Sequence, residues 1–337
     1  MKSKVESGGK YPKIALIFPG QGSQFEKMGQ QFLRFNNKYL EYFERASDVL
    51  KKDLVRIINA EDEDNSLDNT RFSQVSIFCL SCGLFDYLTG ELSLGQKYID
   101  TILGHSLGEY SALYGSGAYT FEEALSLVAY RGKIMSAADK TAKGMMAAVL
   151  GAESALIEDV LKDYKDKVFI ANYNDYTQIV ISGYEDEVVK AISDLKEKGI
   201  KKVVPLKVNI ASHCPLMIGV SKRLGDYIEN NIRFNDPEIK FLSTTEVSYR
   251  GGKEISQTLI GQLVNPIRWV DSIELLLNRG VDTFIETGPG KVLSGLTAQI
   301  ARKNQKDITI LRTSDLDDIE NTISKLQEKG LLDETRE

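Results

Sequence analysis

The stretch TILGHSLGEYSAL, residues 101–113, places a serine between two glycines directly after an apolar run. The run has the length of a buried strand, and the residues after the serine can form a helix. The pattern Gly-x-Ser-x-Gly at such a junction is typical of the nucleophile elbow, a tight turn that exposes a serine hydroxyl. The stretch therefore predicts an α/β fold with Ser106 as a nucleophile, and it leaves open a small-residue turn without catalytic function.

A serine hydroxyl is a weak nucleophile until a base takes its proton. The chain has two histidines, His105 and His213. Neighbouring side chains leave a turn in different directions, so we expect His105, next to Ser106, to support the turn. His213 follows a strand-like segment in LKVNIASHCPLM and is the remaining candidate. We therefore expect His213 to be the base.

The rest of the chain alternates strand-like and helix-like segments. It begins with the apolar run 14–18, which Pro19 and Gly20 close. Over 145–208 the expected order is strand, helix, strand, strand, helix, strand, which is the ferredoxin-like pattern. The expected strands are 145–151, 167–174, 178–183 and 201–208, and the expected helices are 153–163 and 185–198.

These segments predict an α/β-hydrolase-like body with a parallel sheet and an inserted ferredoxin-like α+β subdomain. The body would be interrupted once, since the strand and helix alternation resumes after the insert. The expected parts are a flexible leader (1–12), a large subdomain (13–143 and 206–337) and a small subdomain (144–205).

Composition excludes several classes of protein. The formal net charge of the 337 residues is −6, with charges of both signs interleaved, so no nucleic-acid partner is expected. No apolar run approaches the roughly 20 residues that span a bilayer, and the N-terminus lacks a signal sequence, so a cytoplasmic protein without a membrane partner is expected.

The three cysteines predict no disulfide framework. Cys79 and Cys82 form a C-x-x-C pair, which could bind a metal or undergo redox chemistry. No second pair and no nearby histidine supports that use, so packing on one face of a helix is favoured. Because neither histidine has metal-ligand spacing, no metal site is expected.

The chain resembles the malonyl-CoA:acyl carrier protein transacylases in six blocks that occur in order: IFPGQGSQ, GHSLGEYSAL, YRGKIM, SHCPLM, QLVNPIRW and ETGPGKVLSGL. Members of that family serve fatty acid synthesis or polyketide synthases that lack built-in acyltransferase domains. The resemblance covers about residues 14–300 and implies the same two-part fold. It also implies ping-pong transfer of a malonyl unit from an acyl-CoA or acyl-carrier-protein donor to an acyl carrier protein, by a monomer that needs no cofactor.

The resemblance also implies roles for single residues. Ser106 would carry the acyl group, and His213 would act as base and then as acid. The backbone N–H groups of Gln21 and Leu107 would form the oxyanion hole. A backbone carbonyl near Gln262 would orient His213, in place of an acidic third residue.

Arg131, in LVAYRGKIM, matches the arginine that binds the malonyl carboxylate in the family. A guanidinium can bind a carboxylate through two parallel hydrogen bonds. Editing hydrolases of the family typically lack this arginine, so its presence favours transfer over hydrolysis. A carrier-protein hydrolase and a docking module without activity remain the rival interpretations.

Two departures from the family pattern concern substrate choice. Asp175 and Tyr176 stand where relatives often have Ser-Pro, in a loop expected beside the acyl pocket. Ser212 stands where many malonyl-specific members have phenylalanine. These three residues are the expected specificity determinants. They leave open a C2-substituted unit (methyl-, hydroxy- or aminomalonyl) that arrives on a carrier protein.

Carrier proteins are acidic, so docking on this acidic chain requires a local basic patch. Lysines cluster near the end of the insert, and Arg268 is another possible contact beside the cleft. A solvated helix end and turn is the favoured interpretation of the cluster, which comprises Lys196, Lys198, Lys201, Lys202 and Lys207.

Overall fold

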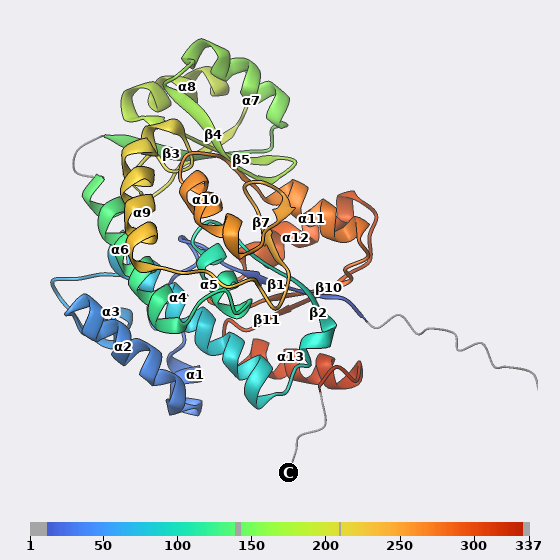
Figure 1. Ribbon diagram of the computed structural model, residues 1–337. Coiled ribbons are helices and arrows are strands. Elements are labelled where there is room, and N and C mark those ends of the chain that lie inside the picture. Colours follow the sequence, from blue (N-terminus) through green and yellow to red (C-terminus); the bar gives the residue numbers. More distant parts are fainter. Residues whose placement is uncertain (1–11, 139–142, 209, 333–337) are drawn as a thin grey trace, which may run out of the picture.

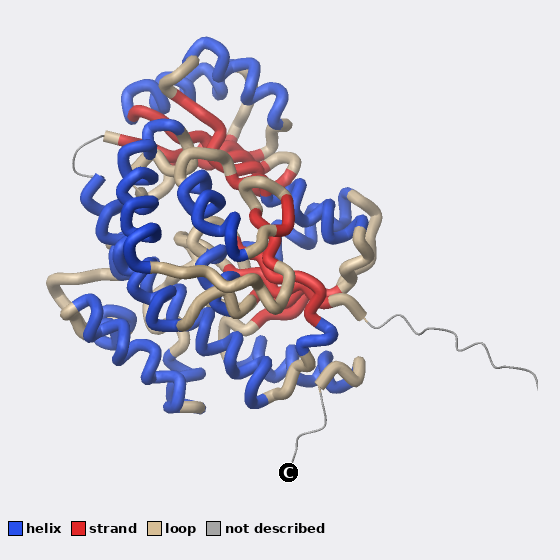
Figure 2. The backbone as a smooth tube through the Cα atoms, viewed as in Figure 1, coloured by secondary structure: helices blue, strands red, loops and turns tan. Residues whose placement is uncertain are grey.

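The structure is a computed structural model that describes residues 12–138, 143–208 and 210–332. The expected leader lies outside these residues, apart from its last position. Figure 1 shows two groups of strands, with the small sheet above the large one and helices around both. Figure 2 shows the same separation of the strands into two groups. The predicted fold class is confirmed.

The large sheet forms the centre of the body. Its strand order is β11-β10-β1-β2-β7-β8. All neighbours are parallel except β7 and β8, which form an antiparallel edge pair. The strands are β1 (Ile14–Phe18), β2 (Ile99–Gly104), β7 (Phe241–Ser243), β8 (Ser248–Tyr249), β10 (Thr283–Glu286) and β11 (Thr309–Arg312).

Helices cover both faces of this sheet, so its central strands are apolar on both sides. In β1, Leu16 and Phe18 face a core with the helices α4, α5 and α6, whereas Ala15 and Ile17 face a core with α11 and α12. The body is thus a three-layer α/β structure. The carboxyl ends of its parallel strands meet at one edge, where such folds bind ligands.

The small sheet has the order β6-β3-β5-β4-β9. Its first four strands are antiparallel neighbours from the insert: β3 (Gly144–Leu150), β4 (Val168–Asp175), β5 (Gln178–Tyr184) and β6 (Lys202–Pro205). The fifth, β9 (Ile267–Arg268), comes from the body and pairs parallel with β4. We propose that 144–205 is a subdomain, and that β9 ties its sheet to the body.

The helices match the predicted alternation. Thr120 caps α6, since its hydroxyl accepts the N–H of Glu123 at 3.3 Å. The helices are α1 (Gln30–Phe35), α2 (Leu40–Leu50), α3 (Leu54–Ile58), α4 (Thr70–Asp86), α5 (Gly108–Gly115), α6 (Phe121–Ala138), α7 (Ser154–Leu161), α8 (Glu185–Glu197), α9 (Ile218–Asn231), α10 (Gly252–Gln262), α11 (Trp269–Asn278), α12 (Val292–Lys303) and α13 (Leu316–Glu328).

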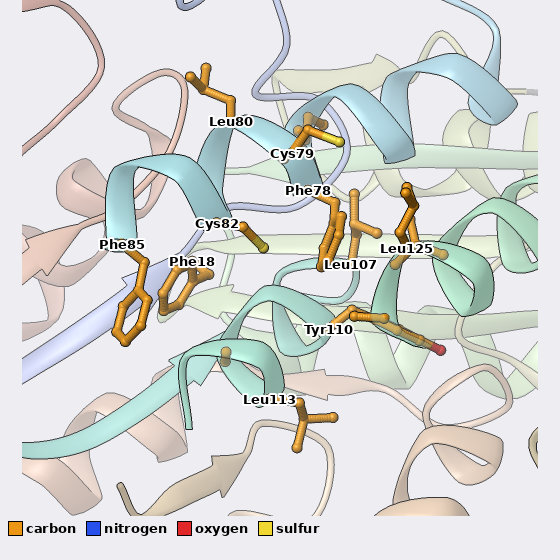
Figure 3. Close-up of a cluster of buried hydrophobic side chains, with 14 of the residues drawn as sticks. Phe18, Phe78, Cys79, Leu80, Cys82, Phe85, Leu107, Tyr110, Leu113 and Leu125 are labelled. Carbon is orange, nitrogen blue, oxygen red and sulfur yellow. The ribbon is translucent and has the colours of Figure 1, made fainter. Parts of the chain in front are cut away.

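Helix α4 and the turn after it, Thr70–Glu91, are long and apolar enough to cross a membrane, and 89% of the apolar window is buried inside the fold. A helix in the centre of a large core is apolar all round for that reason. Figure 3 shows Cys79 and Cys82 of α4 among phenylalanine and leucine side chains. Both thiols are free and buried, which agrees with packing.

Candidate active site

Ser106 lies in a sharp turn between β2 and α5, at the carboxyl edge of the large sheet. Its φ of 52° is left-handed, a strained conformation for a residue with a side chain. A Cβ on Gly104 would lie 1.9 Å from the backbone of Gly108, and a Cβ on Gly108 would lie 2.0 Å from Phe18 O. Both glycines are therefore required because strand, turn and helix are in backbone contact.

The loop after β1 lies against this turn. The N–H of His105 donates to Phe18 O at 3.0 Å, and a Cβ on Gly20 would lie 2.3 Å from His105 O. The loop therefore brings Gln21 beside Ser106. The backbone N–H groups of Gln21 and Leu107 make no hydrogen bond to any residue that the structure describes.

Ser106 and His213 are in hydrogen-bond contact, with 2.9 Å between Oγ and Nε2. The other ring nitrogen, Nδ1, lies 2.8 Å from the backbone oxygen of Gln262. A carbonyl can only accept, so Nδ1 carries the proton and the lone pair of Nε2 faces Ser106. Burial lowers the pKa of His213 to about 3, so the ring is neutral and can accept a proton.

Arg131, on α6, is buried at the same point. Its Nη2 lies 3.2 Å from Ser106 Oγ and 3.5 Å from Gln262 Oε1, and its guanidinium lies over the ring of Tyr110. No carboxylate lies within ion-pair distance of it in the part of the chain that the structure describes, and its Nε has no hydrogen-bond partner there. Burial lowers its pKa. A buried cation without a counter-ion is costly and can bind an anion strongly.

A cavity of about 500 Å³ opens between the body and the small sheet. Gln21, Ser106, Arg131 and His213 line it, and so does Ser212. Part of the remaining wall comes from β3, β4 and β5, the segment after β6 and the start of α12: Met146, Ala148, Asn172, Asn174, Gln178, Val180, Leu206, Lys207, Val208, Val292, Leu293 and Leu296. The loop after β1 and His105 also line the cavity. The site thus combines a nucleophile, a base and a cation in one cavity.

His105 lies where the elbow meets the small sheet. Its Nε2 is 2.9 Å from Asn174 Oδ1 and 3.4 Å from Asn172 Nδ2, and its ring packs near Trp269. It makes no contact with Ser106 Oγ among the hydrogen bonds of the described residues. This position fits support of the turn.

Two predicted specificity residues lie elsewhere. Asp175 and Tyr176 line a second cavity, not the one that contains Ser106. The Asp175 carboxylate accepts the N–H of Thr177 at 2.6 Å, and the Tyr176 hydroxyl contacts Glu274 and Asn304. They form the turn between β4 and β5 and attach it to the body. Neither residue lines the Ser106 cavity, whereas Asn174 and Gln178 on either side of this turn do, so the part of Asp175 and Tyr176 in substrate choice stays a prediction.

The candidate docking residues also separate. Lys198, Lys201 and Lys202 line a shallow hollow beside the start of α7, whereas Lys207 lines the Ser106 cavity. Arg268 lies in the second cavity, in an ion pair with Asp271.

Sequence reasoning missed several residues of the site. Asn172 and Asn174 alternate along β4, so the pattern FIANYN places both on one face, and that signal was available. Glu109 is fully buried and bonds to the side chain of Gln262 at 2.5 Å. Its signal was a charged residue in the first turn of an otherwise apolar helix.

Comparison with known proteins gives the same family as the six sequence blocks. The acyl transferase domain model matches residues 15–329. The malonyl CoA-acyl carrier protein transacylase of Haemophilus influenzae is 35% identical over 291 residues, which cover 86% of this chain and 92% of that protein. The enzyme of the same name from Staphylococcus aureus strain COL is 33% identical and covers 91% and 97%.

Solved structures agree over a similar length. The malonyl-CoA:acyl carrier protein transacylase of Xanthomonas oryzae pv. oryzae superposes with a TM-score of 0.86 at 31% identity, over 93% of this chain and 98% of that one. A malonyl-transacylase in complex with its type II polyketide synthase acyl carrier protein superposes with a TM-score of 0.86 at 31% identity, over 93% of this chain and 99% of that one. The chain therefore belongs to the acyl transferase family, among the malonyl-CoA:acyl carrier protein transacylases.

Proposed function

We propose that the protein transfers a malonyl unit from malonyl-CoA, through an ester on Ser106, to the phosphopantetheine thiol of an acyl carrier protein. One observation carries the choice of substrate. Arg131 is 1% exposed, lies 3.2 Å from the serine oxygen, and has no ion-pair partner among the described residues. A malonyl group, unlike an acetyl group, ends in a carboxylate that can supply the missing charge.

The first half-reaction uses the hydrogen bonds already present. Nε2 of His213 takes the proton of Ser106 as Oγ attacks the thioester carbonyl carbon. The carbonyl oxygen becomes an oxyanion, which the free N–H groups of Gln21 and Leu107 stabilise. The intermediate then releases the coenzyme A thiol, which takes the proton from His213, and malonyl-Ser106 remains.

The second half-reaction runs the same steps with another thiol. The carrier-protein thiol gives its proton to His213 and attacks the ester carbonyl carbon. The C–O bond to Ser106 breaks, and Oγ takes the proton back from His213. These steps use only protein groups and thioester substrates, so we propose that the enzyme needs no cofactor and acts as a monomer, with both catalytic residues on one chain.

The free thiols of all three cysteines suit a reducing compartment, and we propose that the protein works in the cytoplasm. Ser212 lies in the cavity wall next to His213, and we propose it as a residue that senses the C2 position of the acyl unit.

The test is the intact mass of the protein after exposure to acetyl-, malonyl- and methylmalonyl-CoA, with and without acyl carrier protein. We expect a malonyl adduct that passes to the carrier thiol. Ser106→Ala should lose the adduct, with a rate loss of about 10⁴-fold or more. Ser111→Ala is the matched control, because it removes a buried hydroxyl from α5, the helix that follows Ser106, outside the cavity.

Arg131→Ala provides the test of substrate choice. We expect it to lower the malonylation rate about 100-fold, as expected for the loss of a charge-assisted contact, and to favour acetyl-CoA. A methylmalonyl adduct in place of the malonyl adduct would mean that methylmalonyl-CoA is the substrate. Release of free acid from acyl-carrier protein would mean that the protein is a hydrolase. If no CoA gives an adduct, the same measurement is made with acyl groups bound to a carrier protein.

A further inference from the structure

Glu109, in the first turn of α5, is a fully buried carboxylate next to the proposed catalytic residues. Its Oε1 accepts the backbone N–H of Thr244 at 2.6 Å and the Thr244 hydroxyl at 2.9 Å. Its Oε2 accepts the side-chain N–H of Gln262 at 2.5 Å. The N–H groups of Thr244 and Gln262 can only donate, one to each carboxylate oxygen, so the position requires an acceptor at both oxygens, which an ionised carboxylate supplies.

The contact with Glu109 determines how the Gln262 amide is turned. One hydrogen of Nε2 points to Glu109, and Nε2 also donates to the backbone oxygen of Ser106 at 3.0 Å. With both hydrogens used on that side, the amide oxygen is turned toward Arg131, 3.5 Å from Nη2. The backbone oxygen of the same residue holds Nδ1 of His213. Gln262 therefore links the nucleophile, the base and the cation.

We propose that Glu109 is a positioning residue that fixes the orientation of the Gln262 amide and, through it, holds the Arg131 guanidinium in place for the acyl carboxylate. This inference rests on the proposed function for its substrate. The amide lies between the buried carboxylate of Glu109 and the buried guanidinium of Arg131, with one N–H toward the carboxylate and its oxygen toward the cation. Glu109 is thus the distant counter-charge of Arg131 in the free enzyme.

The charges around Glu109 agree with this arrangement. Arg131 on α6 interacts favourably with it, whereas Glu246, from the segment between β7 and β8, repels it, and Tyr110 adjoins it on α5. Burial raises the pKa of Glu109 to about 7. The carboxylate is thus ionised above pH 7 and protonated below it. A protonated Glu109 would no longer carry the negative charge that interacts favourably with Arg131.

Glu109→Gln is the test variant, because it keeps the shape and removes the acceptor-only character. Whichever way the new amide is turned, its NH₂ faces a donor, either on Thr244 or on Gln262. We expect the Gln262 amide to flip and to place its NH₂ against Arg131. Malonylation of Ser106 should slow about 30-fold, the size expected for a misplaced charge-assisted hydrogen bond, while acetylation should change less than about threefold.

A pH profile of the first half-reaction gives a second measurement. In the wild type, malonylation should fall as the pH drops through about 7, because Glu109 takes up a proton there. In Glu109→Gln this limb should be absent. Glu246→Gln is the matched control: it removes a nearby carboxylate that contacts Arg250 and Thr258 and leaves the Gln262 network intact. It should keep the pH limb, moved to slightly lower pH.

Equal slowing of malonyl and acetyl transfer in Glu109→Gln, or an unchanged pH limb, would show a merely structural residue. A crystal structure of the variant decides the inference without any substrate. We expect the Arg131 guanidinium to leave Gln262, and an unmoved guanidinium would overturn the inference. If the wild type takes no malonyl group, the proposed function fails, and the crystal structure still decides the role of Glu109.

Discussion

Two strand-to-helix junctions at the same sheet edge use buried glutamates in opposite ways. At the junction of β10 and α12, the carboxylate of Glu286 accepts the N–H of Leu293 at 3.1 Å and of Ser294 at 2.7 Å. At the junction of β2 and α5, Glu109 accepts no N–H of its own helix and bonds instead to Thr244 and Gln262. Both carboxylates are fully buried.

The difference determines which helix start can bind a substrate. The carboxylate of Glu286 already accepts N–H groups in the first turn of α12. The positive end of this helix dipole is therefore largely neutralised and can bind another anion only weakly. The N–H of Leu107, at the start of α5, has no partner in the described part of the chain and can stabilise a developing oxyanion. Glu109 is free to organise the side chains around the serine because it does not cap the helix.

The largest effect should follow from breaking the elbow itself. Gly108→Ala would put a methyl group 2.0 Å from Phe18 O, and backbone atoms on both sides cannot yield easily. We expect the free energy of unfolding to fall by at least about 3 kcal/mol, measured by urea denaturation. The acylation rate of any folded protein should fall with it.

Gly295→Ala is the control at the other junction. This glycine lies inside α12 with no atom within 4 Å of an added Cβ, so alanine should stabilise the helix by about 0.5–1 kcal/mol. If both substitutions were tolerated equally, close backbone contact would not be what the elbow glycine provides.

We expect the free energy of unfolding to fall in acid, because His213 is buried and neutral in the folded protein. The pKa of His213 is lowered from 6.5 to about 3, so the unfolded chain binds a proton below pH 6.5 and the folded protein does not. This difference in pKa does not lower the free energy of unfolding above pH 6.5. It lowers the free energy of unfolding progressively as the pH falls from 6.5 toward 3. Between pH 8 and pH 5 the loss should be about 2 kcal/mol. Urea denaturation at several pH values measures it.

Glu109 titrates in the opposite sense, since its raised pKa makes the folded protein bind a proton first between pH 7 and 4.5. The informative quantity is therefore the difference between the wild type and His213→Gln, which lacks the histidine and keeps Glu109. Parallel pH curves for the two proteins would mean that His213 is charged or solvated in the folded state.

The sequence was sufficient to predict those features that depend on local pattern. The apolar run and turn around Ser106 predicted the elbow, and the strand and helix order over 144–205 predicted the small sheet. The choice between two histidines led to His213 and the family blocks led to Arg131, and the structure brings both within 3.2 Å of the serine oxygen. Their roles stay proposals until the variants are measured.

Features that depend on long-range contact could not be predicted. The pairing of β9 with β4 joins segments about a hundred residues apart. Because β9 is only two residues long, it has no sequence pattern that would predict this pairing. Asp175 and Tyr176 were expected at the acyl pocket because of their place in the sequence, but the path of β4 takes them to another cavity. The partners of Glu109 likewise come from distant segments. The sequence shows the charged residue but does not predict the contacts on which its function depends.

The smallest loss of stability should come from Glu286→Gln, which tests whether the buried glutamates Glu109 and Glu286 have different functions. The new amide can accept only one of the two N–H groups at the start of α12, and it loses the favourable interaction with the helix dipole. We expect the free energy of unfolding to fall by about 1 kcal/mol. The ratio of malonylation to acetylation should stay the same, in contrast to Glu109→Gln. A fall in that ratio would place Glu286 in the charge arrangement around Arg131, and the two junctions would then share one function.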